Sequence, residues 1–377
     1  MSGIIPVAFN LQSENEIKKI GNGEPEFTVI LKKPISKSDL LTSTSLALGE
    51  AYMRGDIEVD KDLYQVLNLF LGEMGKFTTN KSKLHSLLYT ATGKGHQKKE
   101  VTSHYDIGNN FYSLWLDETM SYSCAYFKDK NNTLYEAQMN KIHHILDKLS
   151  LEKGMSLLDI GCGWGSLLIE AAKKYQVKGT GITLSKEQYD KFKERIKEEN
   201  LEHLLEVEIM DYRDLSSTAL LFDRVVSVGM IEHVGRDNYD LFMKNVNHVL
   251  RKKGVFLLHS ITALKEHPGD AWIKKYIFPG GTVPSLRELI QILPEYQFYT
   301  LDVESLRRHY NRTLLCWRNR FLEHKVEIVN MMGEEFTRMW ELYLASCAAT
   351  FNNGIIDLHQ ILVSKGVAND LPMTRVV

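Results

Sequence analysis

The sequence predicts an α/β fold: a mostly parallel sheet with helices on both faces, preceded by a small α+β domain. From residue 101 onward, short apolar segments alternate with segments whose apolar residues recur at helical spacing. Such alternation with short connections is typical of a parallel sheet. A glycine-rich turn, GCGWG at 161–165, follows the buried-strand segment LLDI. A turn of this kind lets backbone N–H groups and a helix N-terminus face a ligand.

The individual elements follow from local periodicity. The expected strands, which are short apolar segments, lie at 155–161, 177–184, 204–211, 222–229, 254–261 and 357–365. The expected helices, which have apolar residues at helical spacing, lie at 136–149, 166–175, 186–200, 238–250, 314–332 and 334–351. The stretch 262–295 interrupts this order with Pro268, FPGG and Pro284. It indicates an insertion near the carboxyl ends of the strands, where such sheets bind ligands.

Two domains are expected from this organisation. Residues 1–95 contain a strand-like segment at 26–34 and an amphipathic helix at 61–74. The polar, glycine-containing stretch 92–100 indicates a linker or exposed loop. The larger domain is therefore expected at 96–377.

Composition excludes several classes of protein. The 377 residues carry a net charge of -2, with 44% apolar and 25% charged residues, so no strong field selects nucleic acid. There is no run of about 18 apolar residues for a membrane-spanning helix. Residues 1–16 lack the charged start and apolar core of a signal peptide, so no secretory leader is expected. The four cysteines have neither CxxC nor metal-ligand spacing, which predicts a reduced, cytoplasmic protein without a metal site.

The glycine turn favours a nucleoside ligand other than a dinucleotide. Its spacing is Gly161-x-Gly163-x-Gly165, preceded by Asp159, whereas dinucleotide sites use GxGxxG and an acid after the second strand. In this sequence Thr183, and not an acid, stands at the end of the second expected strand. The alternative is a tight strand-to-helix turn with no ligand.

Longer motifs carry a family resemblance. LDIGCGWG at 158–165 resembles motif I of S-adenosylmethionine (SAM)-dependent methyltransferases. The entry segment HYDIGNNFYSLWLDETMSYSCAYF at 104–127 resembles cyclopropane-fatty-acid-phospholipid synthases and their mycolic-acid relatives, as do MIEHVG, LLHSI, HYNRTLLCW and LALGEAYMRGDIEV. The resemblance spans nearly the whole chain. It implies a class I SAM-dependent methyltransferase fold, which is Rossmann-like, with a lipid-binding insertion around 262–330.

The resemblance also implies a reaction. Members of this family transfer a methylene group from SAM to the cis double bond of a phospholipid acyl chain, through a carbocation and with bound bicarbonate as the base. The positions that match the family's catalytic residues are Cys124, Glu232, His259, Ile261 and Tyr310. Cys124 and Ile261 would offer backbone N–H groups to the anion. His259 and Tyr310 would donate from side chains, and Glu232 would accept the bicarbonate's own proton.

Each of these residues also has a plainer interpretation. Cys124 could be a small core thiol, His259 a satisfied core histidine, Glu232 part of a solvated loop and Tyr310 a surface ring. Their occurrence together at family spacing favours the functional interpretation. Cys347 matches a region where the family has an assigned active-site cysteine, but this chemistry needs no thiol nucleophile, so a core role is favoured.

The SAM pocket is implied in the same way. Its expected residues are Tyr122 and Ser123 at the methionine carboxylate end, Asp159, Gly161 and Gly163 at the turn, Thr183 and Gln188 by the ribose, and Asp211 and Tyr212 by the adenine.

The expected partners are a membrane phospholipid and a second copy of the chain. With no spanning helix, peripheral association with the inner face of the cell membrane is expected, through the amphipathic helix in 61–77 and the basic stretch HQKKE. Packing of this helix on its own domain is the alternative. Two other functions stay open: a fatty-acid methyltransferase that makes a methyl branch, and an inactive lipid-binding module.

Overall fold

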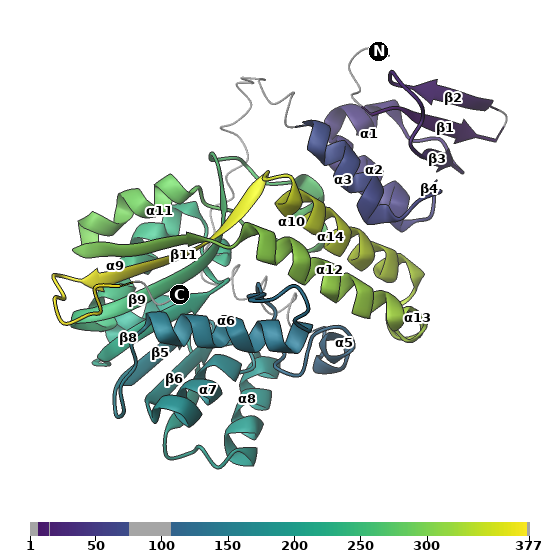
Figure 1. Ribbon diagram of the computed structural model, residues 1–377. Coiled ribbons are helices and arrows are strands. Elements are labelled where there is room, and N and C mark those ends of the chain that lie inside the picture. The colour runs from purple at the N-terminus through teal and green to yellow at the C-terminus, as the bar shows by residue number, and fades with distance from the viewer. Residues whose placement is uncertain (1–6, 15, 75–106, 375–377) are drawn as a thin grey trace. The chain divides into compact units, whose positions relative to one another are not determined.

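The computed structural model describes residues 7–14, 16–74 and 107–374, which form two compact units (Figure 1). The described parts of the first unit are the residues up to 74 together with 268–279 and 310–356. The second unit holds the remaining described residues. The predicted domain boundary at 95, the linker 92–100 and HQKKE lie outside the described residues.

A seven-stranded sheet forms the centre of the second unit. Its strand order is β10-β11-β9-β8-β5-β6-β7. Their bounds are β5 Ser156–Ile160, β6 Lys178–Thr183, β7 Leu205–Ile209, β8 Phe222–Val228, β9 Leu250–Ala263, β10 Phe298–Ser305 and β11 Ile356–Lys365. The pairs β5–β6, β6–β7, β5–β8 and β8–β9 are parallel, and β10–β11 is antiparallel. The predicted, mostly parallel α/β sheet is therefore confirmed.

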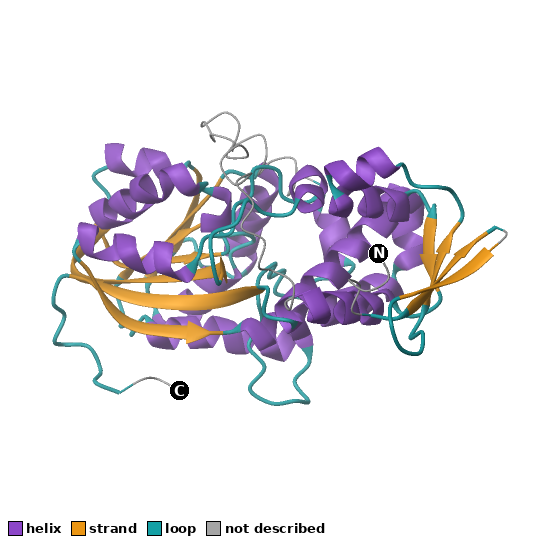
Figure 2. Cartoon of the chain, turned by 90° about the horizontal axis from the view of Figure 1, so that it is seen from above, coloured by secondary structure: helices purple, strands orange, loops and turns teal. Residues whose placement is uncertain are grey.

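Helices cover both faces of this sheet (Figure 2). Leu157 and Leu158 are neighbours on β5 but belong to two different cores, because successive strand residues point to opposite faces. One core contains residues of α6 (Leu134–Lys148), α7 (Ser166–Tyr175) and α8 (Lys186–Glu198). The other contains residues of α9 (Tyr239–Val249) and α11 (Leu286–Ile292). A short helix, α5 (Asn109–Ser113), precedes them in the chain.

The first unit combines a small sheet with helices from three chain segments. The sheet order is β2-β1-β3-β4, with bounds β1 Phe9–Ser13, β2 Glu16–Ile20, β3 Thr28–Leu31 and β4 Ile57–Val59. Its helices are α1 Lys37–Thr42, α2 Thr44–Met53, α3 Leu63–Met74, α10 Ala271–Tyr276, most of α12 Arg307–Glu323, α13 Lys325–Met332 and α14 Glu334–Asn352. Arg338 of α14 donates to the carbonyl oxygens of Tyr52 and Ile57, which ties the late helix to the early segment.

The apolar side of α3 packs in part inside its own unit, which favours the alternative expectation, packing on its own domain, over docking on a membrane. Leu63 and Val66 are buried, and the Phe70 ring lies edge-on to Phe9 and Phe27 at 5.5 and 5.4 Å. Leu67, Leu69, Phe70 and Leu71 are half-buried. A helix face that its own domain covers in part has less apolar surface left for insertion into lipid.

One other sequence expectation needs adjustment, whereas the expected place of the insertion agrees with the structure. The single helix expected at 314–332 is two helices, α12 and α13, separated at His324. The insertion leaves β9 at its carboxyl end and closes on itself, since the Ala263 N–H donates to the Pro284 carbonyl at 2.8 Å. Residues 268–279 of this insertion belong to the first unit.

Among the described residues, no helix has the length and apolarity needed to cross a bilayer.

Candidate active site

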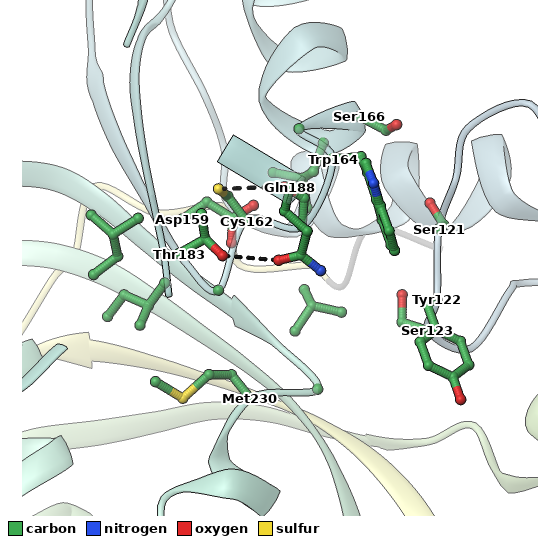
Figure 3. A pocket seen from close by; sticks show the side chains of 18 of the residues that line it. Ser121, Tyr122, Ser123, Asp159, Cys162, Trp164, Ser166, Thr183, Gln188 and Met230 are labelled. Atoms are coloured by element: carbon green, nitrogen blue, oxygen red, sulfur yellow. Dashed lines mark hydrogen bonds between the residues drawn. The ribbon is translucent and has the colours of Figure 1, made fainter. Parts of the chain in front are cut away.

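A pocket opens at the carboxyl ends of β5 and β6, where the glycine turn lies (Figure 3). Its lining includes most of the residues expected to bind SAM, namely Tyr122, Ser123, Asp159, Gly161, Gly163, Thr183, Gln188 and Tyr212. It also includes Lys141, Trp164, Met230 and His233, which the sequence did not single out. The position agrees with the general rule for ligands of open α/β sheets.

The glycine turn is shaped by its backbone. Gly161 and Gly163 have φ values of 84° and 55°, the left-handed region that residues with a Cβ rarely adopt. A Cβ on Gly163 would meet no atom of the described residues within 4 Å, so it would enter the open pocket. The N–H groups of Gly161 and Cys162 both donate to the Ile182 carbonyl. These two amides therefore hold the turn to β6 and do not face a ligand.

Thr183 and Gln188 form one hydrogen-bonded pair at the end of β6. The Thr183 hydroxyl donates to the Gln188 Oε1 at 2.8 Å and accepts from the Ser185 N–H at 3.2 Å. The Gln188 amide nitrogen consequently lies on the side away from Thr183 (Figure 3). It is available as a donor to a hydroxyl of a ligand in the pocket, such as a ribose.

Asp159 is a buried carboxyl without a complete set of partners. It is 3% exposed, and its Oδ1 has no hydrogen-bond partner among the described residues. Burial raises the pKa of Asp159 to about 7, and the positive charge of Lys141 opposes that rise. A buried, unpaired carboxylate oxygen is costly unless a ligand donates to it.

The segment with Tyr122 and Ser123 is held by α6. Gln138 is fully buried, and its amide donates to the carbonyl oxygens of Ser121 and Ser123 at 3.3 and 2.9 Å. Lys141 donates to the Ser123 hydroxyl at 3.0 Å. Sequence reasoning missed both α6 residues. The available signal was polar residues at helical spacing within the apolar face of an otherwise ordinary amphipathic helix.

The two residues expected beside the adenine differ in position. Tyr212 lines the pocket and packs edge-on to Phe242, with ring centroids 5.4 Å apart. Asp211 is not part of this lining. Its carboxylate accepts from the Arg213 guanidinium at 2.6 Å and from the Arg213 N–H at 2.9 Å.

A second cluster of polar groups lies near the ends of β8 and β9. Glu232 is buried, and its Oε1 accepts from the Ile261 N–H at 2.6 Å and from the Ser260 hydroxyl at 3.4 Å. Its Oε2 has no partner in the part of the chain that the structure describes. Burial raises the pKa of Glu232 to about 7. The Ile261 amide, expected to bind an anion, is engaged by Glu232 and so orients that carboxyl group.

His259 complements Glu232 as a donor. Its Nδ1 lies 3.2 Å from the side-chain amide nitrogen of Gln360, and donation by that amide to Nδ1 places the ring proton on Nε2. That Nε2 is buried and unpaired within the described ranges. Burial lowers the pKa of His259 to about 3, and Lys141 and Lys148 reinforce the effect. The imidazole is therefore neutral and presents one N–H donor.

The remaining predicted catalytic residues are divided between the units. Cys124 is buried in the second unit, where its sulfur lies 3.2 Å from the Ala125 carbonyl oxygen and 3.9 Å from that of Leu306, two possible acceptors for its S–H. Tyr310 lies in the first unit, with its ring 4.5 Å from that of Phe351. Cys347 is on α14 of the same unit, and burial raises the pKa of its thiol to about 12. Such a thiol is protonated at neutral pH, which makes it a poor nucleophile.

Models of two protein families match parts of this chain. A model of the family described as mycolic acid cyclopropane synthetase matches residues 93–361. The chain belongs to this family. A second model, for a domain of unknown function, matches residues 5–82. The resemblance inferred from the motifs is thus confirmed.

Two relatives align with almost the whole chain. A cyclopropane-fatty-acyl-phospholipid synthase of Escherichia coli (strain K12) is 39% identical over 365 residues, covering 94% of this chain and 92% of the relative. A "Probable fatty acid methyltransferase" of Pseudomonas putida is 38% identical over 371 residues, covering 93% and 91%.

Solved structures establish the fold class. A cyclopropane synthase from Mycobacterium tuberculosis superposes with a TM-score of 0.68 at 34% identity, covering 75% of this chain and 100% of that one. A mycolic acid cyclopropane synthase complexed with SAH and CTAB gives 0.67 at 35% identity, covering 71% and 98%. This family member is therefore a SAM-dependent enzyme with the class I methyltransferase fold. The unpaired Asp159 oxygen, the open space at Gly163 and the Gln188 donor fit that cofactor.

Proposed function

We propose that this protein is a cyclopropane-fatty-acyl-phospholipid synthase. The observation that carries the proposal is 39% identity to the Escherichia coli enzyme of that name over 94% of the chain. The reaction adds one CH₂ group across the cis double bond of an unsaturated phospholipid acyl chain. When bound, SAM supplies the electrophilic methyl group, and the carbocation left on the acyl chain closes to a ring after loss of a proton.

The residues of the pocket would orient the methyl donor. Gln188 offers an amide donor on one wall, and Asp159 a buried acceptor on another. Held in this way, the methyl donor would have a fixed orientation for attack by the double bond. Positioning of this kind lowers barriers by several kcal/mol, on the order of 7 or more in the most favourable cases. The buried surroundings would also keep water from trapping the cation.

Bicarbonate is the proposed base for the proton that the new methyl group loses. Glu232 and His259 support this, because they hold one buried acceptor and one buried donor that are unpaired within the described residues. His259 would donate its Nε2–H to the anion, and Glu232 would accept the proton of the bicarbonate hydroxyl. The Cys124 N–H is a further proposed donor in this unit. A role for Tyr310, which belongs to the first unit, is proposed from the family resemblance alone. A buried anion persists only with such a set of hydrogen bonds.

The membrane and assembly assignments complete the proposal. We assign lipid docking to residues 1–95, catalysis to 96–377 and acyl-chain binding to the region around 262–330. The protein would associate peripherally with the cytoplasmic face of the membrane and act as a homodimer. The exposed apolar side chain of Leu41 supports docking through residues 1–95 better than α3 does. Val326, which follows in the chain but belongs to the same compact unit, adds a second exposed apolar side chain to it.

The reaction can be tested directly on lipid. The purified protein is incubated with SAM and vesicles of an oleoyl phospholipid, and the released acyl chains are analysed by mass spectrometry and NMR. We expect a gain of one CH₂ with loss of the olefinic protons and appearance of cyclopropane protons. Acyl chains that stay unchanged while SAM is intact would overturn the proposal and favour an inactive lipid-binding module.

A methyl-branched product is the second candidate. The Pseudomonas putida relative named as a fatty acid methyltransferase, 38% identical over 93% of this chain, favours it. A saturated branched chain would need a reductant, whereas a methylene branch or a ring would not. NMR separates the three, because a ring has high-field methylene protons, a methyl branch a doublet and a methylene branch olefinic protons.

A further inference from the structure

The buried face of α6 carries four polar side chains that have different partners. Gln138, Lys141, His144 and Lys148 are all buried on this helix. Lys148 pairs with Glu304 at 2.5 Å and with Asp302 at 3.3 Å, and His144 bonds to Glu304 at 2.6 Å. Lys141 is the exception, because its ammonium contacts a hydroxyl and no carboxylate within the described residues.

The ammonium of Lys141 has unused hydrogen-bonding capacity. The residue is 4% exposed and lines the same pocket as Asp159 and Ser123. Of its three donors, one is used, toward the Ser123 hydroxyl at 3.0 Å, as far as the described residues extend. Burial lowers the pKa of Lys141 to about 8, so the ammonium is still mostly protonated at neutral pH. A buried cation with free donors indicates an anionic group of a ligand.

The carboxylates near Lys141 do not supply the anionic partner that its ammonium lacks within the described residues. Asp117, whose charge acts on Lys141, already accepts from the Thr119 N–H and hydroxyl at 3.0 Å each. Asp159 keeps one oxygen unpaired within the described residues. The pocket therefore offers a cationic donor and an anionic acceptor. This is the pattern that would recognise a zwitterionic amino acid group.

We propose that Lys141, together with Ser123, binds the carboxylate at the amino-acid end of the cofactor, while Asp159 faces its ammonium. The inference rests on the proposed function only in taking a SAM-type ligand for this pocket. Lys141 is assigned to the cofactor and not to the proposed bicarbonate, because Lys141 lines this pocket whereas Glu232 and His259 do not. Lys141 is thus a further residue for cofactor recognition.

The test compares two ligands that differ in the amino-acid end. Calorimetry measures the affinity of the full-length protein for S-adenosylhomocysteine (SAH) and for 5′-methylthioadenosine, which lacks the amino and carboxylate groups. We expect Lys141→Met to weaken SAH binding by about ten- to hundredfold, the worth of a charge-assisted hydrogen bond. Methylthioadenosine affinity should change by less than about threefold, because this ligand has no carboxylate for Lys141 to contact and substitutions away from an interaction usually have small effects.

Lys148→Met is the matched control, because it removes another buried lysine from the same helix. Its ammonium already has two carboxylate partners, so the variant should melt at a lower temperature. Its ratio of SAH to methylthioadenosine affinity should equal that of the wild type. Ser123→Ala removes only a hydroxyl, and a smaller but selective loss of SAH affinity is expected there if Lys141→Met fails to fold.

Equal losses for both ligands in Lys141→Met and Ser123→Ala would overturn the proposal and make Lys141 a structural residue. Unchanged affinity for SAH would overturn it as well. These binding results can be distinguished from a failure of the proposed cyclopropane synthase reaction. A protein that discriminates SAH through Lys141 but forms no ring product would contradict the cyclopropane synthase function and leave the cofactor assignment standing. A wild-type protein that binds no SAH would contradict both.

Discussion

At the residue scale, burial sets the charge state of the groups in both polar clusters. Asp159 and Glu232 have pKa values raised to about 7, whereas that of His259 is lowered to about 3. In each case burial is the largest cause, because a charge is poorly solvated away from water. Near neutral pH the two carboxyl groups can therefore gain or lose a proton, while the imidazole stays neutral. Groups poised in this way are typical of active sites.

The first prediction concerns Glu232 and pH. If Glu232 accepts the bicarbonate proton, it must be ionised, so turnover should fall as pH drops below about 7, the raised pKa of Glu232. Glu232→Gln should lower turnover by about 10²–10⁴-fold, the usual contribution of a positioned acid–base group. It should leave SAH affinity nearly unchanged. Stopped assays from pH 5.5 to 8.5, with calorimetry, measure both.

The dependence of turnover on CO₂ and bicarbonate is a second test of the proposed base. In the wild type, rigorous degassing should slow the reaction and added bicarbonate should restore it, with no such response in Glu232→Gln. A wild-type rate indifferent to bicarbonate after complete degassing would argue against an external anion as base. A pH profile identical in both proteins would remove Glu232 from that role.

The second prediction concerns Gly163. A valine there would combine a left-handed backbone, φ 55°, with a side chain in the open pocket. We expect SAH binding to become undetectable by calorimetry. The control is Gly154→Val. Gly154 also has a left-handed backbone, φ 84°, and a Cβ there would also meet no atom within 4 Å in the described structure, but Gly154 does not line the pocket. Both variants should lose stability by about 1–2 kcal/mol from backbone strain, and only Gly163→Val should lose the ligand. Retained SAH affinity in Gly163→Val would refute the assignment of the turn.

Sequence reasoning reached many of these residues but not their interactions. Asp159, Thr183 and Gln188 were predictable, because the resemblance to the family's motifs implied them. Asp159 and Thr183 lie toward the carboxyl ends of β5 and β6, and Gln188 lies in the first turn of α8. The engagement of the Ile261 amide by Glu232 was not, since a sequence carries no record of which acceptor a given N–H meets. Lys141 was missed because a lysine within a helix is usually solvated.

At the element scale, local pattern was a good guide to several helices and strands, the 19-residue α14 among them. The helix expected at 166–175 is α7, and the strand expected at 177–184 is β6 apart from its ends. The break at His324 was not predicted, because the apolar periodicity continues across it. The start of β9 was also missed. It begins at Leu250 and passes through Lys253 with φ 63°, a conformation that no sequence pattern signals.

The third prediction concerns the contact between two of these elements. Phe192 of α8 packs so closely on Gly165 that a Cβ there would overlap the ring, and Arg195 of α8 donates to the Trp164 carbonyl at 2.8 Å. Gly165→Ala should therefore push α8 away from the turn. We expect a loss of about 1–3 kcal/mol in the free energy of unfolding, as for an overpacked core, with weaker SAH binding.

Gly154→Ala separates strain from overlap in that experiment. Both glycines have φ near 84°, but an added Cβ on Gly154 meets nothing within 4 Å in the described structure. Denaturant unfolding should therefore show a clearly smaller loss for Gly154→Ala. Equal losses would mean that the backbone conformation alone, and not the contact with α8, explains the requirement for glycine at 165.

At the scale of the whole molecule, distant parts of the chain build each unit. Arg338 binds the carbonyl oxygens of Tyr52 and Ile57, and the Trp272 indole donates to the Met53 sulfur at 3.3 Å. Segments more than 200 positions apart thus share one unit, which a reading of local pattern cannot reveal. Deletion of the N-terminal residues would strip α14 of these partners, so point substitutions are better tests of membrane docking than truncation.

The last prediction concerns how a chain that shows no membrane-spanning helix in its described residues reaches an acyl chain. Leu41 and Val326 of the first unit are 87% and 77% exposed, and each lies near a lysine, Lys37 or Lys325. Peripheral binding commonly combines apolar insertion with attraction of lysine to anionic lipid. The double variant Leu41→Asp/Val326→Asp should therefore bind anionic phospholipid vesicles at least about tenfold more weakly in sedimentation assays, since burying one leucine is worth about 1.5–3 kcal/mol.

Leu221→Asp in the second unit is the control for that experiment. Leu221 is 50% exposed and precedes β8, at the strand end opposite the pocket, so its substitution should leave vesicle binding unchanged. SAH affinity should stay at the wild-type value in all variants, because none of these residues lines the pocket. Activity on detergent-dispersed lipid should suffer less than activity on vesicles, since dispersed substrate needs no docking. Vesicle binding that survives in the double variant, or that fails only in Leu221→Asp, would show that the first unit does not dock through these side chains.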